Sequence, residues 1–235
     1  MSSCPFRFKQ FAIHQDRCAM KVGTDGVALG AWVPLEGARR ILDIGTGTGL
    51  IALMLAQRTA ADCHIDAVEL DLAAAVQAAE NVAASPWPQK IKVHSCAIQD
   101  HVAEAYDLVV SNPPFFRHGQ PFSDSSRQQA RHTSTLNHEE LLHQAERLLT
   151  PTGRLAVILP IAAAEQLQHT AVQQGWYLQL GQRLIPKPGK APNRFLMLFG
   201  RNKTHIEAES IVICAADGAY SDTYSKFVSP FYLAL

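Results

Sequence analysis

Cysteine is scarce in this sequence, and long hydrophobic runs are absent. The 235 residues include five cysteines, an odd number without a CxxC pair. This argues against a disulfide framework or a cysteine zinc knuckle and indicates free thiols in a reducing compartment. No apolar run reaches the length of a membrane span, and the first residues, MSSCPFRFKQF, lack the apolar core of a signal peptide. We therefore expect a cytoplasmic protein with no membrane contact.

An excess of charge of either sign is also missing. The chain has 21 Lys and Arg residues against 21 Asp and Glu residues, so its formal net charge is zero. A global electrostatic attraction to nucleic acid is therefore not implied, and any such surface must come from local segregation of charge. Apolar residues are plentiful at 47%, which is enough for a sizeable core. Since no repeat or linker is evident, we expect one domain over residues 1–235, with residues 1–35 as an N-terminal flap.

From about residue 40 onward, apolar β-rich runs alternate with helical patterns. The expected strands are Ile41–Ile44, Ile65–Val68, Ile91–His94, Leu108–Ser111 and Leu155–Leu159, and the expected helices are Leu50–Arg58, Leu72–Ala84 and Glu139–Leu149. This alternation predicts βαβ units, and hence an α/β fold with a mostly parallel sheet. Asn137, with Glu140 three residues on, is typical of a helix start. Tyr177–Ile185 and Arg194–Gly200 are strand-like and joined by a short link, so they must pair antiparallel.

Three glycines at alternate positions lie between the first expected strand and the helix after it. Gly45, Gly47 and Gly49 would let the backbone turn tightly and approach a ligand closely. About twenty residues beyond this loop, Glu69 ends the next strand, where a carboxylate is expected to hold ribose hydroxyls. Loop, strand and carboxylate together favour an adenosine-containing cofactor over a merely structural turn.

The spacing of these glycines separates two classes of cofactor site. A dinucleotide site would prefer GxGxxG, but the last position of that pattern is Leu50, which disfavours an NAD-dependent oxidoreductase. The GxGxG form preceded by Asp43 resembles motif I of class I methyltransferases, which use S-adenosylmethionine (SAM).

The sequence Asn-Pro-Pro-Phe (Asn112–Phe115) follows the fourth expected strand, at the edge where open α/β sheets bind ligands. Two successive prolines fix φ and remove N–H donors, so the turn is rigid. The Asn112 side-chain oxygen and the Pro113 carbonyl are suited to accept both hydrogens of a planar amine, which favours a pyramidal nitrogen for in-line attack on a sulfonium methyl. Phe115 is expected to stack on an unstacked target ring.

These two motifs together resemble those of amino-methyltransferases that act on adenine N6, guanine N2 or glutamine amides. Other segments are similar to the bacterial tRNA1(Val) adenine-37 N6-methyltransferase family. The matching segments are Phe8–Phe11, Asp16–Gly26, Leu29–Trp32, Ala67–Leu70, Glu80–Asn81, Ser85–Trp87, Gln129–Arg131 and Phe231–Leu233. The resemblance spans essentially the whole chain.

The resemblance implies a Rossmann-like class I methyltransferase fold, a sheet of seven strands with one antiparallel edge strand, and helices on both faces. It implies SAM as cofactor and tRNA as partner through an anticodon-loop adenine. We expect the N-terminal flap to cover the cofactor, and we expect no obligate protein partner. The residues it assigns to SAM are Lys21, Gly23, Thr24, Asp43, Gly45, Gly47 and Glu69. One position departs from the family: Ala97 stands where an aspartate tends to bind the cofactor's adenine. Asp100 is the nearest carboxylate, and we expect it to bind the cofactor in place of that aspartate.

Basic residues occur in two groups that would flank this site. Arg127 and Arg131 follow the Asn-Pro-Pro-Phe motif, and Lys187, Lys190 and Arg194 lie in a stretch without acidic residues. Either these are solvated loops, or they bind RNA phosphates. The histidines show no ligand spacing along the chain, since even those of His138–His143 are five apart where a zinc-protease helix needs four, so no metal site is expected.

Three other functions stay open at this point. Methylation of guanine N2 in ribosomal RNA uses the same motif, and so does methylation of a protein glutamine, which the basic segments disfavour. A non-catalytic module that binds SAM or a nucleotide together with RNA would not require an intact Asn112–Phe115.

Overall fold

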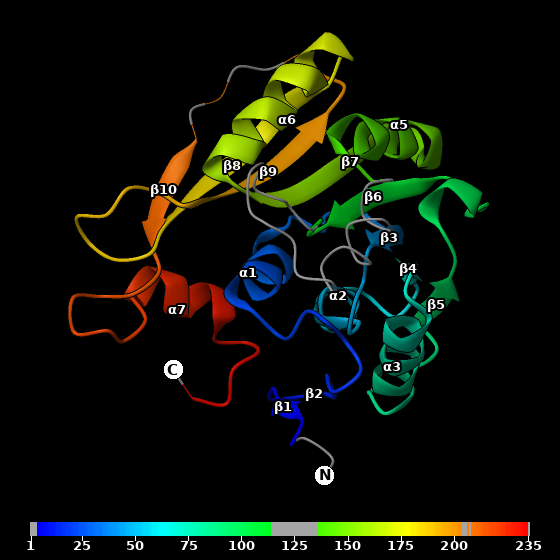
Figure 1. Cartoon of the computed structure of the whole chain (residues 1–235), viewed down its shortest axis with the longest axis horizontal. Coiled ribbons are helices and arrows are strands. Elements are labelled where there is room, and N and C mark those ends of the chain that lie inside the picture. The colour runs from blue at the N-terminus through cyan, green and yellow to red at the C-terminus, as the bar shows by residue number, and fades with distance from the viewer. Residues whose placement is uncertain (1–3, 114–135, 204–205, 207, 235) are drawn as a thin grey trace, which may run out of the picture.

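The computed structural model describes residues 4–113, 136–203, 206 and 208–234. Within these residues an eight-stranded sheet forms the centre of the molecule (Figure 1). Its strands are β3 (Arg40–Ile44), β4 (His64–Glu69), β5 (Ile91–Ser95), β6 (Tyr106–Ser111), β7 (Leu149–Pro160), β8 (Tyr177–Ile185), β9 (Arg194–Gly200) and β10 (Glu209–Val212). They are ordered β10-β8-β9-β7-β6-β3-β4-β5, and β9 runs antiparallel to both of its neighbours while the other pairs are parallel.

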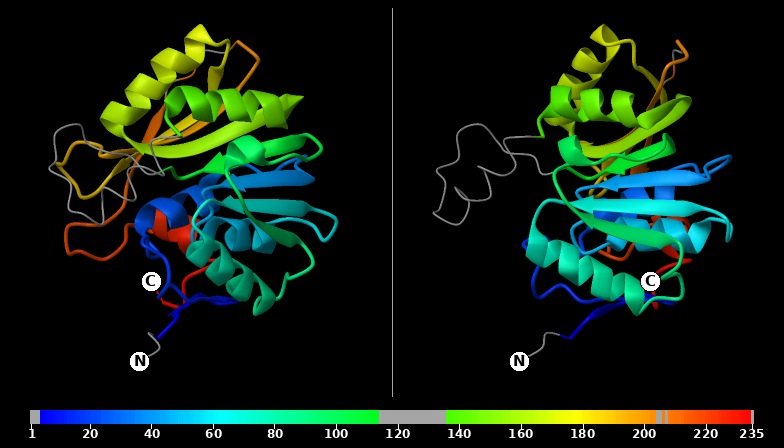
Figure 2. Two further views of the ribbon diagram at one scale, coloured as in Figure 1. Left: turned by 45° about the vertical axis from the view of Figure 1, so that its right-hand side comes forward. Right: turned by 90° about the vertical axis from the view of Figure 1, so that its right-hand side faces the viewer.

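Helices cover both faces of this sheet (Figures 1 and 2). One face carries α1 (Thr24–Trp32), α2 (Leu50–Arg58), α3 (Leu72–Ala83) and α7 (Asp222–Val228), and the other carries α5 (His138–Leu148) and α6 (Ile161–Gln173). Alternate residues of the strands pack into two separate apolar cores, one on each face, as expected for strands buried on both sides. None of the described helices combines the length and the apolar character needed to span a membrane.

The α/β fold is confirmed, and most of the expected helices and strands begin and end within two residues of the observed ones; β7 instead begins at Leu149, six residues before the expected start at Leu155. The sheet needs two corrections. We expected seven strands with the antiparallel strand at the edge, whereas β9 lies inside the sheet, between β7 and β8. The crossover through α6 places β8 one position away from β7, and β9 fills the gap by folding back along a short link. An eighth strand, β10, then pairs parallel with β8 at the edge.

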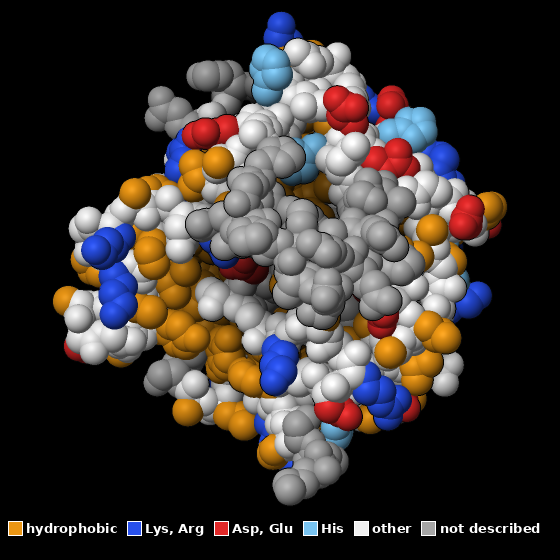
Figure 3. Space-filling view, in the orientation of Figure 1, with side chains coloured by type: hydrophobic (Ala, Val, Ile, Leu, Met, Phe, Trp, Pro, Cys, Tyr) orange, Lys and Arg blue, Asp and Glu red, His pale blue; other side chains and the backbone are white. Residues whose placement is uncertain are grey.

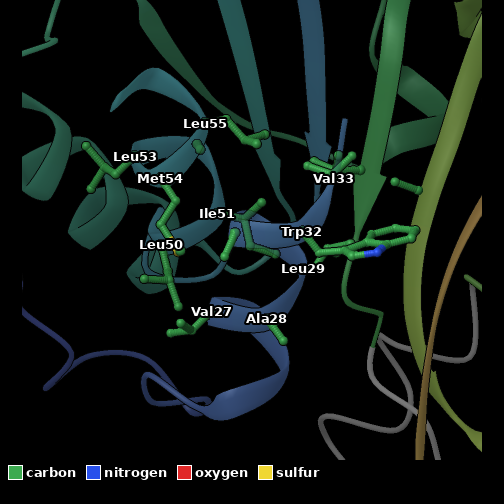
Figure 4. Close-up of a cluster of buried hydrophobic side chains, with 14 of the residues drawn as sticks. Val27, Ala28, Leu29, Trp32, Val33, Leu50, Ile51, Leu53, Met54 and Leu55 are labelled. Carbon is green, nitrogen blue, oxygen red and sulfur yellow. The ribbon is translucent and has the colours of Figure 1, made fainter. Parts of the chain in front are cut away.

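The first part of the chain is more closely packed than a loose flap. The helix α1 is buried from Gly26 to Trp32 and packs against α2 (Figure 4), where Val27 faces Leu50 and Leu29 lies beside Ile51. This helix is therefore part of the domain core, and only the residues before it are left for a covering segment.

The residues before α1 form a small hairpin, β1 (Phe6–Arg7) with β2 (Ala12–Ile13), at the end of the molecule where the C-terminal segment also lies (Figure 2). Phe8 is buried and pairs with Tyr232 near the C-terminus. The side chain of Asn81 on α3 accepts from the backbone N–H of His14 and donates to its carbonyl, both at 2.9 Å. These contacts fix the segment against α3 and the C-terminal residues.

Candidate active site at the carboxyl edge of the sheet

The carboxyl ends of β3, β4 and β6 meet at one edge of the sheet. Ile44 pairs with Val68 on one side and with Ser111 on the other, and the Ser111 hydroxyl donates to the Ile44 carbonyl at 2.9 Å. The residues that follow these strands are therefore neighbours in space, although the sequence separates them widely. Asn112 and the glycine loop share this edge.

The glycine loop has the backbone that its sequence predicts. Gly45, Gly47 and Gly49 have φ values of 71°, 58° and 82°, in the left-handed region that side chains disfavour. The N–H of Gly45 donates to the Val68 carbonyl at 2.9 Å, which ties the loop to β4. Gly49 then begins α2 as its N-cap residue.

Glu69 binds this loop directly. Its Oε2 accepts a hydrogen bond from the N–H of Gly47 at 2.9 Å, and its Oε1 accepts from the N–H of Asp71 at 2.9 Å. A carboxylate has about four acceptor positions, so both oxygens keep capacity for further donors such as ribose hydroxyls. The two backbone bonds hold the carboxylate at the end of β4, where the sequence places it.

Asp43 lies beneath the loop as a buried carboxyl group. It is 0% exposed, and the hydroxyl of Thr46 donates to its Oδ2 at 2.6 Å. Burial raises the pKa of Asp43 to about 7, and the negative charge of Glu69 adds to the rise. A cationic ligand beside this carboxyl group would lower that pKa again. Thr46 is a partner that the glycine spacing alone did not single out.

Two observations show that the loop has room and unused bonding capacity for a ligand. The Oδ1 atom of Asp43 is buried and accepts no hydrogen bond within the described part of the chain. A Cβ atom built on Gly45 or Gly47 would meet no atom within 4 Å there. Together with Glu69, this open cradle fits an adenosine-containing cofactor that carries a positive charge.

Asn112 lies where the N-terminus of α1 approaches β6. A Cβ atom on Gly26 would come to 4.0 Å from the Asn112 side-chain nitrogen and to 3.0 Å from Leu50 Cδ2, so a larger residue at Gly26 would crowd this region. Pro113 is buried. Phe115, the third residue expected to take part in catalysis, lies outside the described residues.

The start of α1 brings the expected methionine-end residues to this edge. Gly23 is the N-cap of the helix and Thr24 its first residue, and neither these two nor Lys21 is buried. Asp25 accepts a hydrogen bond at 2.7 Å from Nε of Arg194 on β9. Arg194 was expected to bind RNA, and in the structure it is ion-paired with α1.

The segment around Asp100 lies next to Glu69. The short helix η1 (Ile98–Asp100) follows β5, and the N–H of Cys96 donates to the Glu69 carbonyl at 3.1 Å. Asp100 is exposed and Ala97 is the N-cap of η1. Asp100 therefore sits at the correct edge of the sheet, and its contact with an adenine ring stays a prediction.

The other basic candidates divide into described and undescribed residues. Lys187 and Lys190 are exposed in the loop between β8 and β9, where the Lys190 N–H donates to the Lys187 carbonyl at 3.1 Å. Figure 3 shows basic side chains at the left edge of this face, where Figure 1 places that loop. Arg127 and Arg131 lie outside the described residues.

All five cysteines are free thiols, as expected.

Comparison with known proteins identifies relatives over the full length. The model of the methyltransferase small domain family matches residues 28–172. Two proteins named tRNA1(Val) (adenine(37)-N6)-methyltransferase are 52% identical: that of Tolumonas auensis over 100% of this chain and 99% of its own, and that of Aeromonas salmonicida over 98% of each. A solved structure from Agrobacterium tumefaciens, described as a predicted O-methyltransferase, shares the fold, with a TM-score of 0.67 and 17% identity over 90% of this chain and 99% of that one.

Proposed function

This chain belongs to the methyltransferase small domain family and, within it, to the tRNA1(Val) (adenine(37)-N6)-methyltransferases, and from that premise we propose that it methylates the N6 amine of adenine 37 in the anticodon loop of tRNA1(Val). Its cofactor is SAM, as for the class I methyltransferase fold that it shares. The observation that carries the proposal is the pairing of Ile44 with Ser111, which puts Asn112 beside the glycine loop.

Different residues around the glycine loop bind different parts of SAM. Glu69 accepts hydrogen bonds from the ribose hydroxyls, because the hydrogen bond from the Gly47 N–H already fixes its carboxylate at the loop. The buried Asp43 carboxyl group, whose Oδ1 atom accepts no hydrogen bond in the described part of the chain, lies on the side of the positively charged sulfonium of SAM. Lys21 and the N-terminus of α1 at Gly23 and Thr24 supply positive charge and N–H groups for the methionine carboxylate.

Other groups complete the cofactor site in this proposal. Gly45 and Gly47 leave space beneath the ligand, and Asp100 accepts a hydrogen bond from its adenine amine. The whole chain acts as one domain, in which the segment before α1 covers the cofactor. When bound, SAM would supply an electrophilic methyl group on its sulfonium sulfur. The amine nitrogen would take up this methyl group, the sulfur would leave as a neutral thioether, and the proton lost by the amine would pass to solvent.

Asn112 and Pro113 prepare the amine for this reaction. The lone pair of an exocyclic amine is delocalised into the ring, so the nitrogen is a poor nucleophile. The Asn112 side-chain oxygen and the Pro113 carbonyl each accept one of its hydrogens, which favours a pyramidal nitrogen and stabilises the charge that develops on it. Phe115 stacks on the extruded base, and neither Asn112 nor Pro113 acts as a base.

The substrate is held by local positive charge, because the net charge of the chain is zero. Lys187 and Lys190 are exposed and project from the sheet in the β8–β9 loop. Together with Arg127, Arg131 and Arg194 they contact phosphates of the anticodon arm. Extruding an unpaired loop adenine costs only a few kcal/mol of lost stacking. The free thiols indicate a reducing compartment, and we propose that the enzyme acts on tRNA in the cytoplasm.

The test is to incubate the purified protein with methyl-labelled SAM and total tRNA that lacks the modification, and then to identify the labelled nucleoside. We expect N6-methyladenosine at one position of one tRNA species. Label in ribosomal guanine or in a protein glutamine would assign the enzyme to one of the alternative classes. Tight binding of SAM and tRNA without any label in a nucleoside would indicate a non-catalytic module.

A further inference from the structure

A cluster of metal-binding side chains lies outside the residues assigned to SAM and RNA. Asp66 on β4, His94 on β5 and His101 just after η1 each offer one ligand atom, and these atoms lie within 4.8 Å of one another. Asp66 is three residues before Glu69 along β4, and on the sheet it belongs to the face that carries α5 and α6. The residues are 28 and 7 positions apart in sequence, so local spacing does not reveal them.

The contacts inside the cluster are close. Nε2 of His94 is 2.5 Å from Oδ1 of Asp66, and the two imidazole rings have their centroids 4.8 Å apart at an angle of 70°. Ligand atoms around one tetrahedral zinc ion lie about 3–3.5 Å from each other. A shared ion would therefore require side-chain rotations that open the His94–Asp66 pair and bring His101 closer to it.

A second layer of hydrogen bonds orients these side chains, as is usual for metal ligands. The hydroxyl of Tyr106 donates to Oδ2 of Asp66 at 2.8 Å and lies 2.8 Å from Nε2 of His101. Arg147 on α5 donates to the carbonyls of His101 and Ile98, at 3.0 Å and 2.8 Å. The turn that carries His101 is thus fixed before any ion binds.

The cluster is accessible to an ion from solvent. The side chains of His94 and Asp66 are 22% and 16% exposed, whereas His101 is buried. An open hollow of about 410 Å³ reaches Asp66 from the amino ends of β4 and β5, between residues such as Arg40 and Lys92. Of the nearby cations, Arg40 is ion-paired with Glu104, and Arg147 bonds to backbone carbonyls.

We propose that Asp66, His94 and His101 form a binding site for a transition-metal ion of the zinc class. Two imidazoles and one carboxylate are a donor set that Zn²⁺ accepts, with the remaining position left to water, whereas Mg²⁺ and Ca²⁺ prefer sites made of oxygen ligands. The ion would join β4, β5 and the turn after η1, and so stabilise the edge of the sheet on which Glu69 and Asp100 lie. We assign the ion no part in methyl transfer, because none of the three ligands belongs to the proposed catalytic residues.

The test uses tag-free full-length protein that has been freed of metal by a chelator and then dialysed. Titration with Zn²⁺ is followed by calorimetry, and Co²⁺ is used as a spectroscopic probe because its visible bands report imidazole coordination. We expect one ion per chain and a higher melting temperature, since a ligand that binds only the folded state stabilises it. Mg²⁺ at the same concentration should do neither.

The variant His94→Gln should weaken Zn²⁺ binding by about tenfold or more and remove the Co²⁺ bands. His94 is preferred to the buried His101, whose replacement risks unfolding, and the melting temperature without metal reports whether the fold is kept. The matched control is His143→Gln, because His143 is exposed on α5. If the wild type binds no Zn²⁺, or if His94→Gln binds it as tightly as the wild type does, the cluster is a hydrogen-bond network only and the proposal is wrong.

Discussion

Arg194 on β9 donates a hydrogen bond to Asp25 on α1 at 2.7 Å, across 169 positions of sequence. Both side chains are only about a quarter exposed, at 26% and 24%. The pair links the start of β9 to the helix that brings Gly23 and Thr24 to the cofactor site. A substitution of Arg194 therefore changes α1 as well as the charge of the surface, and it cannot serve as a clean test of RNA binding.

Lys187 and Lys190 allow that test, because both are exposed and neither is near α1 in sequence or pairing. We expect Lys187→Ala/Lys190→Ala to raise the Km for tRNA and to reduce the salt dependence of binding by roughly two phosphate contacts, with SAM affinity unchanged. Steady-state kinetics over a range of salt concentrations measure both effects. Arg39→Ala is the control, since Arg39 is 79% exposed at the amino end of β3. An unchanged Km and salt slope in the double variant would mean that this loop is simply solvated.

Glu69→Ala is expected to weaken SAM binding by more than tenfold. A hydrogen bond to a charged group contributes about 1.5–3 kcal/mol, and the ribose is expected to make such bonds with this carboxylate. Calorimetric titration with SAM gives the dissociation constant directly. Glu104→Ala, at an 85% exposed carboxylate before β6, should bind SAM like the wild type. Equal affinity of the Glu69 variant and the wild type would show that the ribose is held elsewhere.

Asp43 makes stability depend on pH in the absence of the cofactor. Its pKa is raised by burial to about 7, whereas in the unfolded chain it titrates near 3.8. Between these values the folded state holds a proton that the unfolded state has lost, so the free energy of unfolding falls as the pH rises towards 7. Asp43→Asn removes this loss because the amide does not ionise.

We therefore expect the stability difference between Asp43→Asn and the wild type to shift in favour of the variant by roughly 2 kcal/mol from pH 5 to pH 8. Denaturant unfolding at both pH values measures it, and other titrating groups cancel because both proteins share them. The same variant should bind SAM more weakly. A stability difference that is constant over this range would contradict the raised pKa.

The sequence predicted the part of the fold that local patterns control. The bounds of α2, β8 and β9 agree with the structure, and Asn137 caps α5 as expected, accepting from the Glu140 N–H at 2.8 Å. The position of β9 inside the sheet was not predictable in this way, because strand order depends on how the crossover through α6 packs. The short strand β10 has only four residues, too few for a reliable alternation of apolar and polar side chains.

The candidate site was predictable where its residues adjoin strand ends. Gly47 and Asn112 follow β3 and β6, and Glu69 is the last residue of β4, so the parallel arrangement alone brings them to one edge. The partners that fold back from distant segments were not. Nothing near Asp25 indicates Arg194, and nothing near Asp66 indicates its two histidines, because these contacts exist only once β9 and β5 take their places in the sheet.

The central claim is that this edge of the sheet activates an amine for methylation, and it is tested most directly at Asn112. Asn112→Ala should lower the single-turnover rate of methyl transfer to tRNA by on the order of 100-fold or more, because it removes an acceptor that stabilises charge in the transition state. SAM affinity should stay within a few-fold, since the cofactor is bound by other residues. The control is Asn202→Ala, at an exposed asparagine after β9. A rate near half that of the wild type, with unchanged SAM binding, would contradict the role given to Asn112 and the reaction proposed at this site.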